Sequence, residues 1–483
     1  MTDPRKPSAA QIRRRDLAKL AGGCAALTNT SLLSTLFSLS ATNAATAAEG
    51  NLTGYKAIIC LFMFGGNDSF NTLSPLSTAE RADYLEARGG VYAPGNGALG
   101  LPEEGLHSIT DSSSGRQFAI HPDMPEMKEL YDNGKLTFLC NVGSLVEPTT
   151  MQEYQARTNL PLGLFSHADL QRHWMTSVPQ TRSQVDGWAG RMADVVNGTT
   201  NTNPTVSMNI AIDNVNMLQT GSSVVPYVID RNGAREVQNY NQPWTRETIY
   251  RTLNDDALSR SYGNLIEKTF AQVNRNSIDA AVAFNEAVNI DDNPVDAHFP
   301  TENLTRLQEN LRIVARAIRA QETLGQQRQI FFVSDGGYDN HDELINNQSG
   351  NMSDVSQSLK NFQDAIDAIG MTNDVVLFTA SDFARTLNSN GRGSDHAWGG
   401  NQLIMGGPVA GGRLHGTYPE SLAPGNELDL GRGRLLPTTS VDEMACELAM
   451  WYGLPNDGSM PEILPNIRNF VGAGTDYPIG FLG

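Results

Sequence analysis

The chain has 483 residues, of which 40% are hydrophobic and 18% are charged, and this composition suits one large globular domain or two closely joined ones. The formal net charge is −18 at pH 7, and no basic run follows Lys19. A surface of this sign repels nucleic-acid phosphates and anionic membranes, so we expect no nucleic-acid partner.

Residues 1–48 have the features of an export signal. The segment "RRDLAK" at residues 14–19 places paired arginines ahead of a weakly apolar stretch, and small residues of the Ala-x-Ala kind follow at residues 45–47. This order is similar to a twin-arginine signal, which predicts the twin-arginine translocase as a partner and a periplasmic or extracellular location. An ordinary secretory signal is the alternative. A membrane anchor is disfavoured because polar residues interrupt the apolar stretch, so we expect no stable membrane span.

Continuous apolar runs predict four buried strands, at residues 55–66, 136–143, 328–337 and 374–381. Because these runs are unbroken instead of alternating, we expect each strand to be buried on both faces of a parallel sheet. Apolar residues at helical spacing lie between the runs, in residues 121–135 and 301–325. The alternation predicts an α/β fold, with a mostly parallel sheet and helices on both of its faces.

The segment between residues 200 and 300 differs from its surroundings. Residues 200–245 are rich in strand-forming patterns, and residues 246–300 are helical in pattern and carry many charges. We therefore expect 200–300 to be an insertion or cap over a core that consists of residues 49–199 and 301–483.

Polar side chains follow three of the four predicted strands. They are Asn67 and Asp68 after the first, Asp335, Asp339 and His341 after the third, and Asp382, Arg385, Asp395 and His396 after the fourth. Ligands of such sheets bind beyond the carboxyl ends of the strands, so these side chains are expected to converge. Clustered carboxylates repel one another unless a cation compensates them. Mixed Asp and His ligands favour one or two divalent ions, with zinc, manganese or iron the best suited.

Each of these residues also has an ordinary structural interpretation. Asp68 after two glycines could form a turn or an N-cap, and Asp335 could belong to a turn. Asp382 and Arg385 have the spacing of an ion pair on a helix. The pairs Asp339 with His341 and Asp395 with His396 could lie in solvated loops. Their common position after strands favours the metal-ligand interpretation for Asp68, Asp339, His341, Asp382, Asp395 and His396.

The segment "GLFSHADLQRHW" at residues 163–174 predicts a helix that begins at Ser166, with Asp169 at the third helical position as in a capping box. Capping alone would explain this pattern. In a functional interpretation, Ser166 is a hydroxyl nucleophile at a helix N-terminus, where backbone N–H groups favour an anion. His167 would then be a metal ligand or proton carrier beside it.

Several segments in order along the chain resemble the bacterial domain of unknown function 1501 family. They are "LFMFGGNDSFNTLSP", "FAIHPDMPEMKELYDNGKLTFLCNVGS", "SHADLQRHW", "DGWAGR", "SDGGYDNHD" and "SDFARTLNSNGRGSDHAWGGNQLIMGG". This family is grouped with the alkaline phosphatase and sulfatase superfamily. The resemblance implies an alkaline-phosphatase-like core, one or two divalent metals and a Ser, Thr or modified Cys nucleophile.

The resemblance also assigns roles residue by residue. Asp68 matches a metal-binding aspartate after the first strand, and Asp339 with His341 resembles a second ligand pair. "TASDF" at residues 379–383 is similar to the superfamily's Thr-Ala-Asp-His segment, with Phe383 in place of the imidazole. Asp395 and His396 resemble the remaining ligand pair. The sulfatase motif Cys-x-Pro-x-Arg does not occur in this sequence.

We therefore expect an exported, metal-dependent hydrolase or transferase of phosphate or sulfate esters, acting on a small ester or a polysaccharide. Arg385 or Asn67 would steady the ester oxygens, and Ser166 or water would attack. The alternative is a non-catalytic exported protein that serves binding or assembly and whose superfamily site has decayed.

Overall fold

The computed structural model describes residues 52–201, 206–236, 245–262 and 264–482. The expected export signal, residues 1–48, lies outside these described residues. Within the described part of the chain, no helix combines the length and the apolar character needed to span a bilayer.

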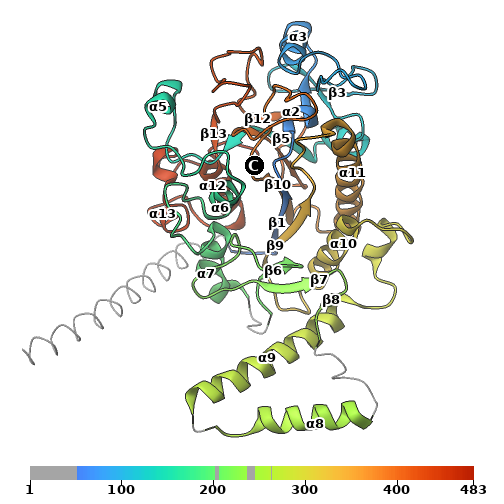
Figure 1. Cartoon of the computed structure of the whole chain (residues 1–483). Helices are drawn as coiled ribbons and strands as arrows, with labels where there is room; N and C mark the ends of the chain where they lie inside the picture. The colour runs from blue at the N-terminus through green and yellow to red at the C-terminus, as the bar shows by residue number, and fades with distance from the viewer. Residues whose placement is uncertain (1–51, 202–205, 237–244, 263, 483) are drawn as a thin grey trace, which may run out of the picture.

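A ten-stranded, mostly parallel sheet forms the centre of the molecule (Figure 1). Its order is β12-β5-β11-β10-β1-β9-β6-β7-β8, and β13 also pairs with β5. Parallel pairing joins β1 to β9 and β10, whereas β11 runs antiparallel to both β10 and β5. The strands are β1 Lys56–Phe64, β5 Leu136–Gly143, β6 Asn209–Ile212, β7 Tyr227–Asp230, β8 Gly233–Ala234, β9 Arg328–Gly336, β10 Val375–Ser381, β11 Gly400–Met405, β12 Leu414–Gly416 and β13 Thr439–Ser440. The four apolar runs of the sequence correspond to β1, β5, β9 and β10, so the predicted α/β class is confirmed.

Helices cover both faces of this sheet (Figure 1). Alternate residues of β1 belong to two separate cores: Ile59 and Leu61 to one, Ile58 and Cys60 to the other. The first core contains residues of α3 Thr78–Ala87, α4 Pro125–Asp132, α9 Leu265–Val288, α10 Arg306–Arg319 and α11 Leu344–Ala368. The second contains residues of α6 His167–Thr176, α7 Trp188–Thr200, α12 Val441–Tyr452 and α13 Met460–Ile463. Burial on both faces explains why the strand sequences are apolar without alternation.

Smaller elements complete the described structure. A three-stranded antiparallel sheet has the order β2-β4-β3. Its strands are β2 Leu73–Pro75, β3 His107–Thr110 and β4 Gln117–Ile120. The short helices are α2 Ser69–Thr72, α5 Met151–Ala156, η2 Pro294–His298 and η3 Ile467–Asn469.

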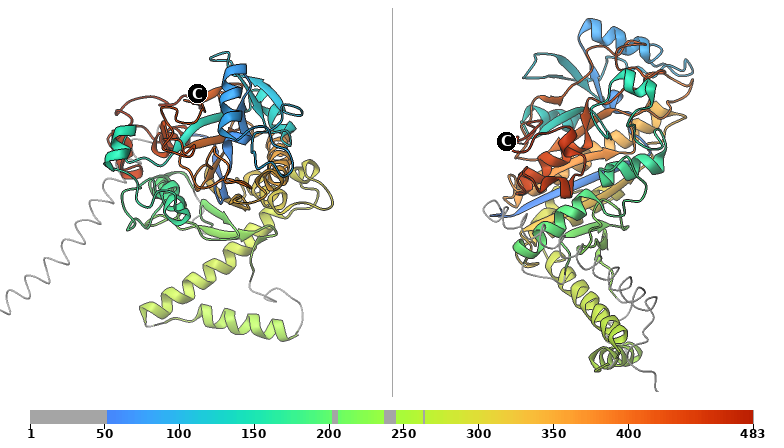
Figure 2. Two further views of the ribbon diagram at one scale, coloured as in Figure 1. Left: turned by 45° about the horizontal axis from the view of Figure 1, so that its top comes forward. Right: turned by 90° about the vertical axis from the view of Figure 1, so that its left-hand side faces the viewer.

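The segment expected to be an insertion or cap contains two different parts. Strands β6 and β7 belong to the main sheet, because β6 pairs in parallel with β9 and with β7. Helix α8, Thr245–Ser259, and the N-terminal part of α9 form a hairpin that projects away from the sheet and from α6 (Figures 1 and 2). Phe284 and Val288, near the end of α9, are buried in the core and anchor the hairpin. The projecting part is therefore the helices alone, and the strands before them extend the core.

Candidate metal centre

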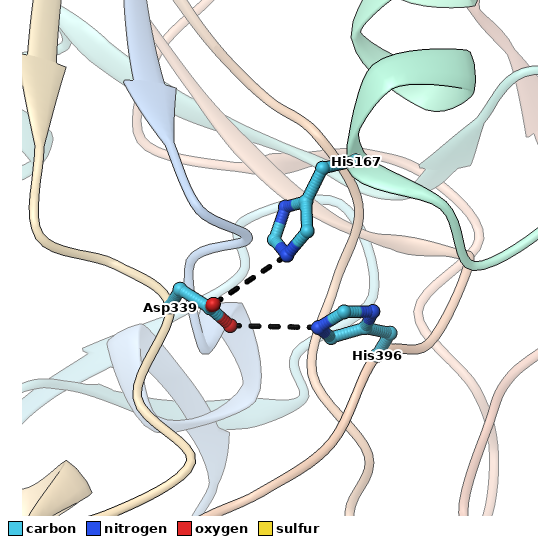
Figure 3. A group of neighbouring side chains, drawn as sticks. All are labelled: His167, Asp339 and His396. Carbon is cyan, nitrogen blue, oxygen red and sulfur yellow. Dashed lines mark ion pairs between the residues drawn. The ribbon is translucent and has the colours of Figure 1, made fainter.

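The candidate site lies where β1, β9 and β10 end. These parallel strands are in register, with Met63 of β1 opposite Asp335 of β9 and opposite Ser381 of β10. The loops that follow β9 and β10 therefore leave the same edge of the sheet, and the N-terminus of α6 approaches it from a distant part of the sequence (Figures 1 and 3). This is the edge at which ligands of open α/β sheets bind.

Three side chains from these segments converge (Figure 3). His167, Asp339 and His396 each offer a ligand atom, and these atoms all lie within 4.8 Å of one another. The Nε2 atoms of His167 and His396 are each 3.5 Å from a different carboxylate oxygen of Asp339. His341 joins them, with its Nε2 atom 3.1 Å from Asp339 Oδ1. Thus Asp339, His341 and His396, all predicted as metal ligands, and His167, predicted as a catalytic residue or ligand, share one location.

An oxygen atom holds the far side of each of these three imidazole rings. The Nδ1 atom of His167 lies 2.6 Å from Asp382 Oδ2, and that of His341 lies 3.0 Å from Asp395 Oδ1. His396 Nδ1 donates to the carbonyl oxygen of Phe165 at 2.8 Å. Such contacts fix the proton on Nδ1 and leave the Nε2 lone pair free, as in protein metal sites.

The fit of these residues to a metal rests on the contact between His341 and His396. Their Nε2 atoms are 2.9 Å apart, and in the neutral rings neither carries a proton. Two facing lone pairs repel unless a proton or a cation lies between them. Nitrogen ligands lie about 2.0–2.1 Å from zinc, so two on adjacent positions of one ion are separated by about 2.9–3.4 Å. The donor set and spacing therefore fit one divalent cation.

Arg385 holds Asp339 in place from below the site. Its guanidinium donates to Asp339 Oδ1 at 2.6 Å and to the carbonyl oxygen of Gly65 at 3.3 Å, and it also bonds both the hydroxyl and the carbonyl of Ser394. Partial burial raises the pKa of Asp339, but the hydrogen bond and charge of Arg385 outweigh this effect and leave the pKa lowered. Because Arg385 is 1% exposed and fully engaged, it positions Asp339 and does not reach a bound ester as the sequence had suggested.

Asp382 supports a ligand instead of acting as one. Its Oδ2 atom accepts hydrogen bonds from Gln171 Nε2 at 2.8 Å as well as from His167 Nδ1. The residue is fully buried, and its Oδ1 atom has no hydrogen-bond partner among the described residues. The predicted direct ligation by Asp382 is therefore replaced by an orienting contact, because the ring of His167 stands between this carboxylate and Asp339.

Asp395 has the same relation to His341. One carboxylate oxygen contacts His341, and the other pairs with Arg432, a residue that the sequence did not bring to attention. Asn390 Nδ2 also donates to Asp395, at 3.2 Å. With both oxygens engaged, Asp395 orients a ligand histidine and does not itself face the converging atoms.

Asp68 and Asn67 are turned away from the cluster. Both oxygens of Asp68 pair with the guanidinium of Arg88, and the two side chains are 2% and 0% exposed. The Nδ2 atom of Asn67 donates to Thr72 Oγ1 at 3.2 Å, and Asn67 is 4% exposed. The structure thus places a guanidinium, not a metal, beside Asp68, and it leaves Asn67 out of reach of a ligand at the cluster.

Ser166 precedes α6 but does not form the expected capping box. Its side chain makes no capping hydrogen bond, and Asp169 pairs with Arg182. The hydroxyl is therefore free of the role that would explain it structurally. His167, the first helical residue, projects from this helix start toward Asp339 (Figure 3).

Two aromatic residues hold the imidazole rings from the side. The ring of Phe383 lies 4.8 Å from that of His167 and 4.4 Å from that of His396, between centroids. Gly66 allows this approach, because a Cβ atom there would lie 2.4 Å from the Phe383 ring, and its φ of +88° is unfavourable for other residues. Phe165, which bonds His396 through its carbonyl oxygen, has a φ of +70°. Phe383 thus packs against the ligand histidines, and its aromatic ring in a loop next to two histidines is the signal by which sequence reasoning could have found it.

The fold and the site together define an α/β protein with a candidate metal centre at the carboxyl edge of its sheet. Residues 55–424 match the family described as "Protein of unknown function (DUF1501)", and the chain belongs to this family. A search of the curated proteins gives no match to this sequence.

Three solved structures illustrate the similarity in fold. A lipoteichoic acid synthase from Listeria monocytogenes is 7% identical with a TM-score of 0.34, and the match covers 91% of this chain and 82% of that one. A 2-O GAG sulfatase is 9% identical with a TM-score of 0.29, covering 88% and 76%. An alkaline phosphatase mutant with Mg bound is 9% identical with a TM-score of 0.24, covering 73% and 90%.

Proposed function

We propose that this protein binds one divalent metal ion through His167, Asp339, His341 and His396 and hydrolyses or transfers phosphate or sulfate esters. The observation that carries the proposal is that three Nε2 atoms and one carboxylate converge while an oxygen atom orients each ring from behind. Zinc, manganese and iron are the metals that best suit this mixed nitrogen and oxygen set.

The residues around the centre divide the work. A divalent cation bound there supplies Lewis-acid polarisation of an ester oxygen. Arg385 keeps Asp339 ionised and in position, and Asp382 fixes the tautomer of His167. Ser166 is the proposed nucleophile, because its hydroxyl is not used for capping and it directly precedes His167 at the start of a ten-residue helix. The positive end of this helix favours the anion that such a hydroxyl becomes.

The proposed setting is outside the cytoplasm. The sequence of residues 1–48 is the support for export by the twin-arginine translocase and for a periplasmic or extracellular location. A translocase of this kind carries folded proteins, so the metal can be acquired before export. A small ester or a polysaccharide is the proposed substrate.

A second candidate function is supported by a specific observation. Asn67 and Arg385, the two groups expected to steady ester oxygens, are both buried and bonded to protein atoms. Without them, the same centre could serve a non-catalytic exported protein that binds or assembles. Stoichiometric metal without turnover would favour this second function.

The test combines metal analysis with activity. Protein purified from its native host is expected to contain about one divalent ion per chain and to turn over aryl phosphates or aryl sulfates. The variants His167→Ala and Asp339→Asn are expected to lose the metal and all turnover, since each removes one ligand. His298→Ala, in η2, is the matched control and is expected to keep both.

The outcomes separate the two functions and the absence of either. Metal that binds equally well to wild type and to Asp339→Asn would exclude this centre. Metal without turnover on either ester class would leave the binding function only.

A further inference from the structure

A cavity of about 340 Å³ lies next to the metal centre and is not used by it. One wall comes from the loop at residues 92–99 and the other from the start of α11, closed by Gly391 and Arg392. Its size is at the lower end of the range for small-molecule sites, so it suits a ligand about as large as a single ring. We call it the Tyr92 pocket.

The Tyr92 pocket adjoins the metal centre through the backbone. Glu343 in its wall is two residues from His341, and two consecutive Cα–Cα steps span at most about 7.6 Å. The loop of Gly391 and Arg392 is held to the same segment, since Asn390 Nδ2 donates to the carbonyl oxygen of His341 at 3.1 Å. A molecule whose ester group lies at the metal centre can therefore place its next ring in this pocket.

The first wall is held rigid by its own hydrogen bonds. Asn96 accepts from the backbone N–H groups of Ala93 and Ala98 at 3.1 and 3.0 Å, and it donates to the carbonyl oxygen of Val91 at 2.8 Å. The backbone N–H of Tyr92 donates to Gly100 O at 2.7 Å. Because the wall is preformed, a ligand does not have to order it on binding.

The two walls differ in chemistry. The first presents the half-buried ring of Tyr92 together with Pro94, Ala98 and Leu99. The second presents the carboxylate of Glu343, the amide of Asn346 and the guanidinium of Arg392, with Asn346 Nδ2 donating to Glu343 at 2.9 Å. Arg392 also pairs with Asp342, at 2.8 Å. Within the described structure, the hydroxyl of Tyr92 has no protein partner.

This combination selects one class of ligand. A strongly anionic group in the pocket would face the carboxylates of Asp342 and Glu343, and a wholly apolar one would remove water from three polar side chains without replacing their hydrogen bonds. A pyranose ring satisfies both walls, since its hydroxyls donate to Glu343 and accept from Arg392 and Asn346 while its C–H face packs on Tyr92.

We propose that the Tyr92 pocket binds a neutral sugar ring, so that the ester substrate at the metal centre is carried by a carbohydrate. This inference rests on the proposed function for its catalytic part, whereas sugar binding in the pocket is independent of it.

The test measures sugar binding and turnover separately. In saturation-transfer NMR, methyl glycosides of glucose, galactose, mannose and N-acetylglucosamine are offered to wild type, and at least one is expected to bind. Tyr92→Ala and Glu343→Gln are expected to weaken that binding roughly ten-fold, the loss of one stacked ring or one charged acceptor. Tyr477→Ala is the control, because Tyr477 is a half-buried tyrosine that lines a different cavity.

Turnover then connects the pocket to the centre. For glucose 6-phosphate and glucose 6-sulfate, Tyr92→Ala is expected to raise KM about ten-fold with kcat unchanged, and to leave phenyl phosphate and phenyl sulfate unaffected. His167→Ala is expected to bind the glycoside while losing turnover. Absence of glycoside binding in wild type, or equal binding by both pocket variants and wild type, would overturn the proposal even if aryl esters were hydrolysed. Glycoside binding that depends on Tyr92 in a protein without turnover would support the pocket and reject the hydrolase.

Discussion

At the scale of single residues, the centre depends on where imidazole protons are held. Asp382, Asp395 and the carbonyl oxygen of Phe165 each engage one Nδ1 atom, which turns three Nε2 atoms toward Asp339. Burial lowers the pKa of His396 and so favours its neutral, ligating form. The same kind of residue thus has different roles by position: Asp339 offers ligand atoms, and Asp382 orients a ring.

The orienting role of Asp382 gives a quantitative expectation. In Asp382→Asn the carboxylate charge beside His167 is lost while the shape is kept, and the metal affinity is expected to fall about 10-fold to 100-fold with stoichiometry retained. Competition with a chelator measures this change.

Asp213→Asn is the matched control, because Asp213 forms a surface ion pair with Arg306 and already has a φ of +72°, which Asn adopts readily. An unchanged affinity in Asp382→Asn would show that this carboxylate does not hold His167 for the metal. Complete loss of metal would instead identify Asp382 as a direct ligand.

At the scale of elements, a buried ion pair links the end of β1 to the end of α3. Asp68 follows β1 by four residues, and Arg88 is the C-cap of α3. Their bidentate contact is fully enclosed, and Arg88 also donates to the carbonyl oxygen of Thr386 in the loop after β10, at 3.3 Å. The guanidinium therefore compensates the carboxylate and joins three segments beneath the metal centre.

Removing one partner of this pair should be costly. Arg88→Met leaves an uncompensated buried carboxylate, and the free energy of unfolding is expected to fall by about 3–5 kcal/mol. The double variant Asp68→Asn with Arg88→Met is expected to recover part of this loss, because no charge is left buried. Denaturant titration measures both.

Metal content decides between this role and the one implied by the family resemblance. Asp68→Asn is expected to keep one metal ion per chain, since His167, Asp339, His341 and His396 are untouched. A folded Asp68→Asn protein without metal would restore Asp68 as a ligand.

At the scale of the whole molecule, a buried carboxyl group makes stability depend on pH. Asp442, the second residue of α12, is 1% exposed. Burial raises its pKa to about 7, against the opposing effects of Ser177 and Arg191. Between pH 4 and 7 the folded protein holds a proton that the unfolded chain has released, so the stability that this group contributes falls as the pH rises through that window.

Asp442→Asn should remove this dependence. The variant is expected to match wild type near pH 4 and to exceed it above pH 7 by up to about 4 kcal/mol. Thermal unfolding of both proteins from pH 4 to 8 measures the difference. Parallel curves over the whole range would show that Asp442 is ionised in the folded state.

The sequence by itself determined the sheet and the kinds of atom at its edge. The apolar runs of β1, β5, β9 and β10 are unbroken because both faces of each strand are covered, so composition alone shows their burial. Parallel strands end at one edge, which is why Asp339, His341 and His396 could be expected together. The short strands β6 and β7 were assigned to an insertion because four residues carry too weak a pattern to reveal sheet membership.

Only the tertiary structure decided which of these side chains face a common point. Arg88 reaches Asp68 from the end of a helix, and Asp382 lies behind a histidine that comes from 215 positions away in the chain. Arg385 is consumed by Asp339, Gly65 and Ser394, none of which is its neighbour on a helix. Local sequence sets the backbone conformation and the burial of an element, whereas the partner of a charged side chain depends on distances between loops, which are fixed only when the elements pack.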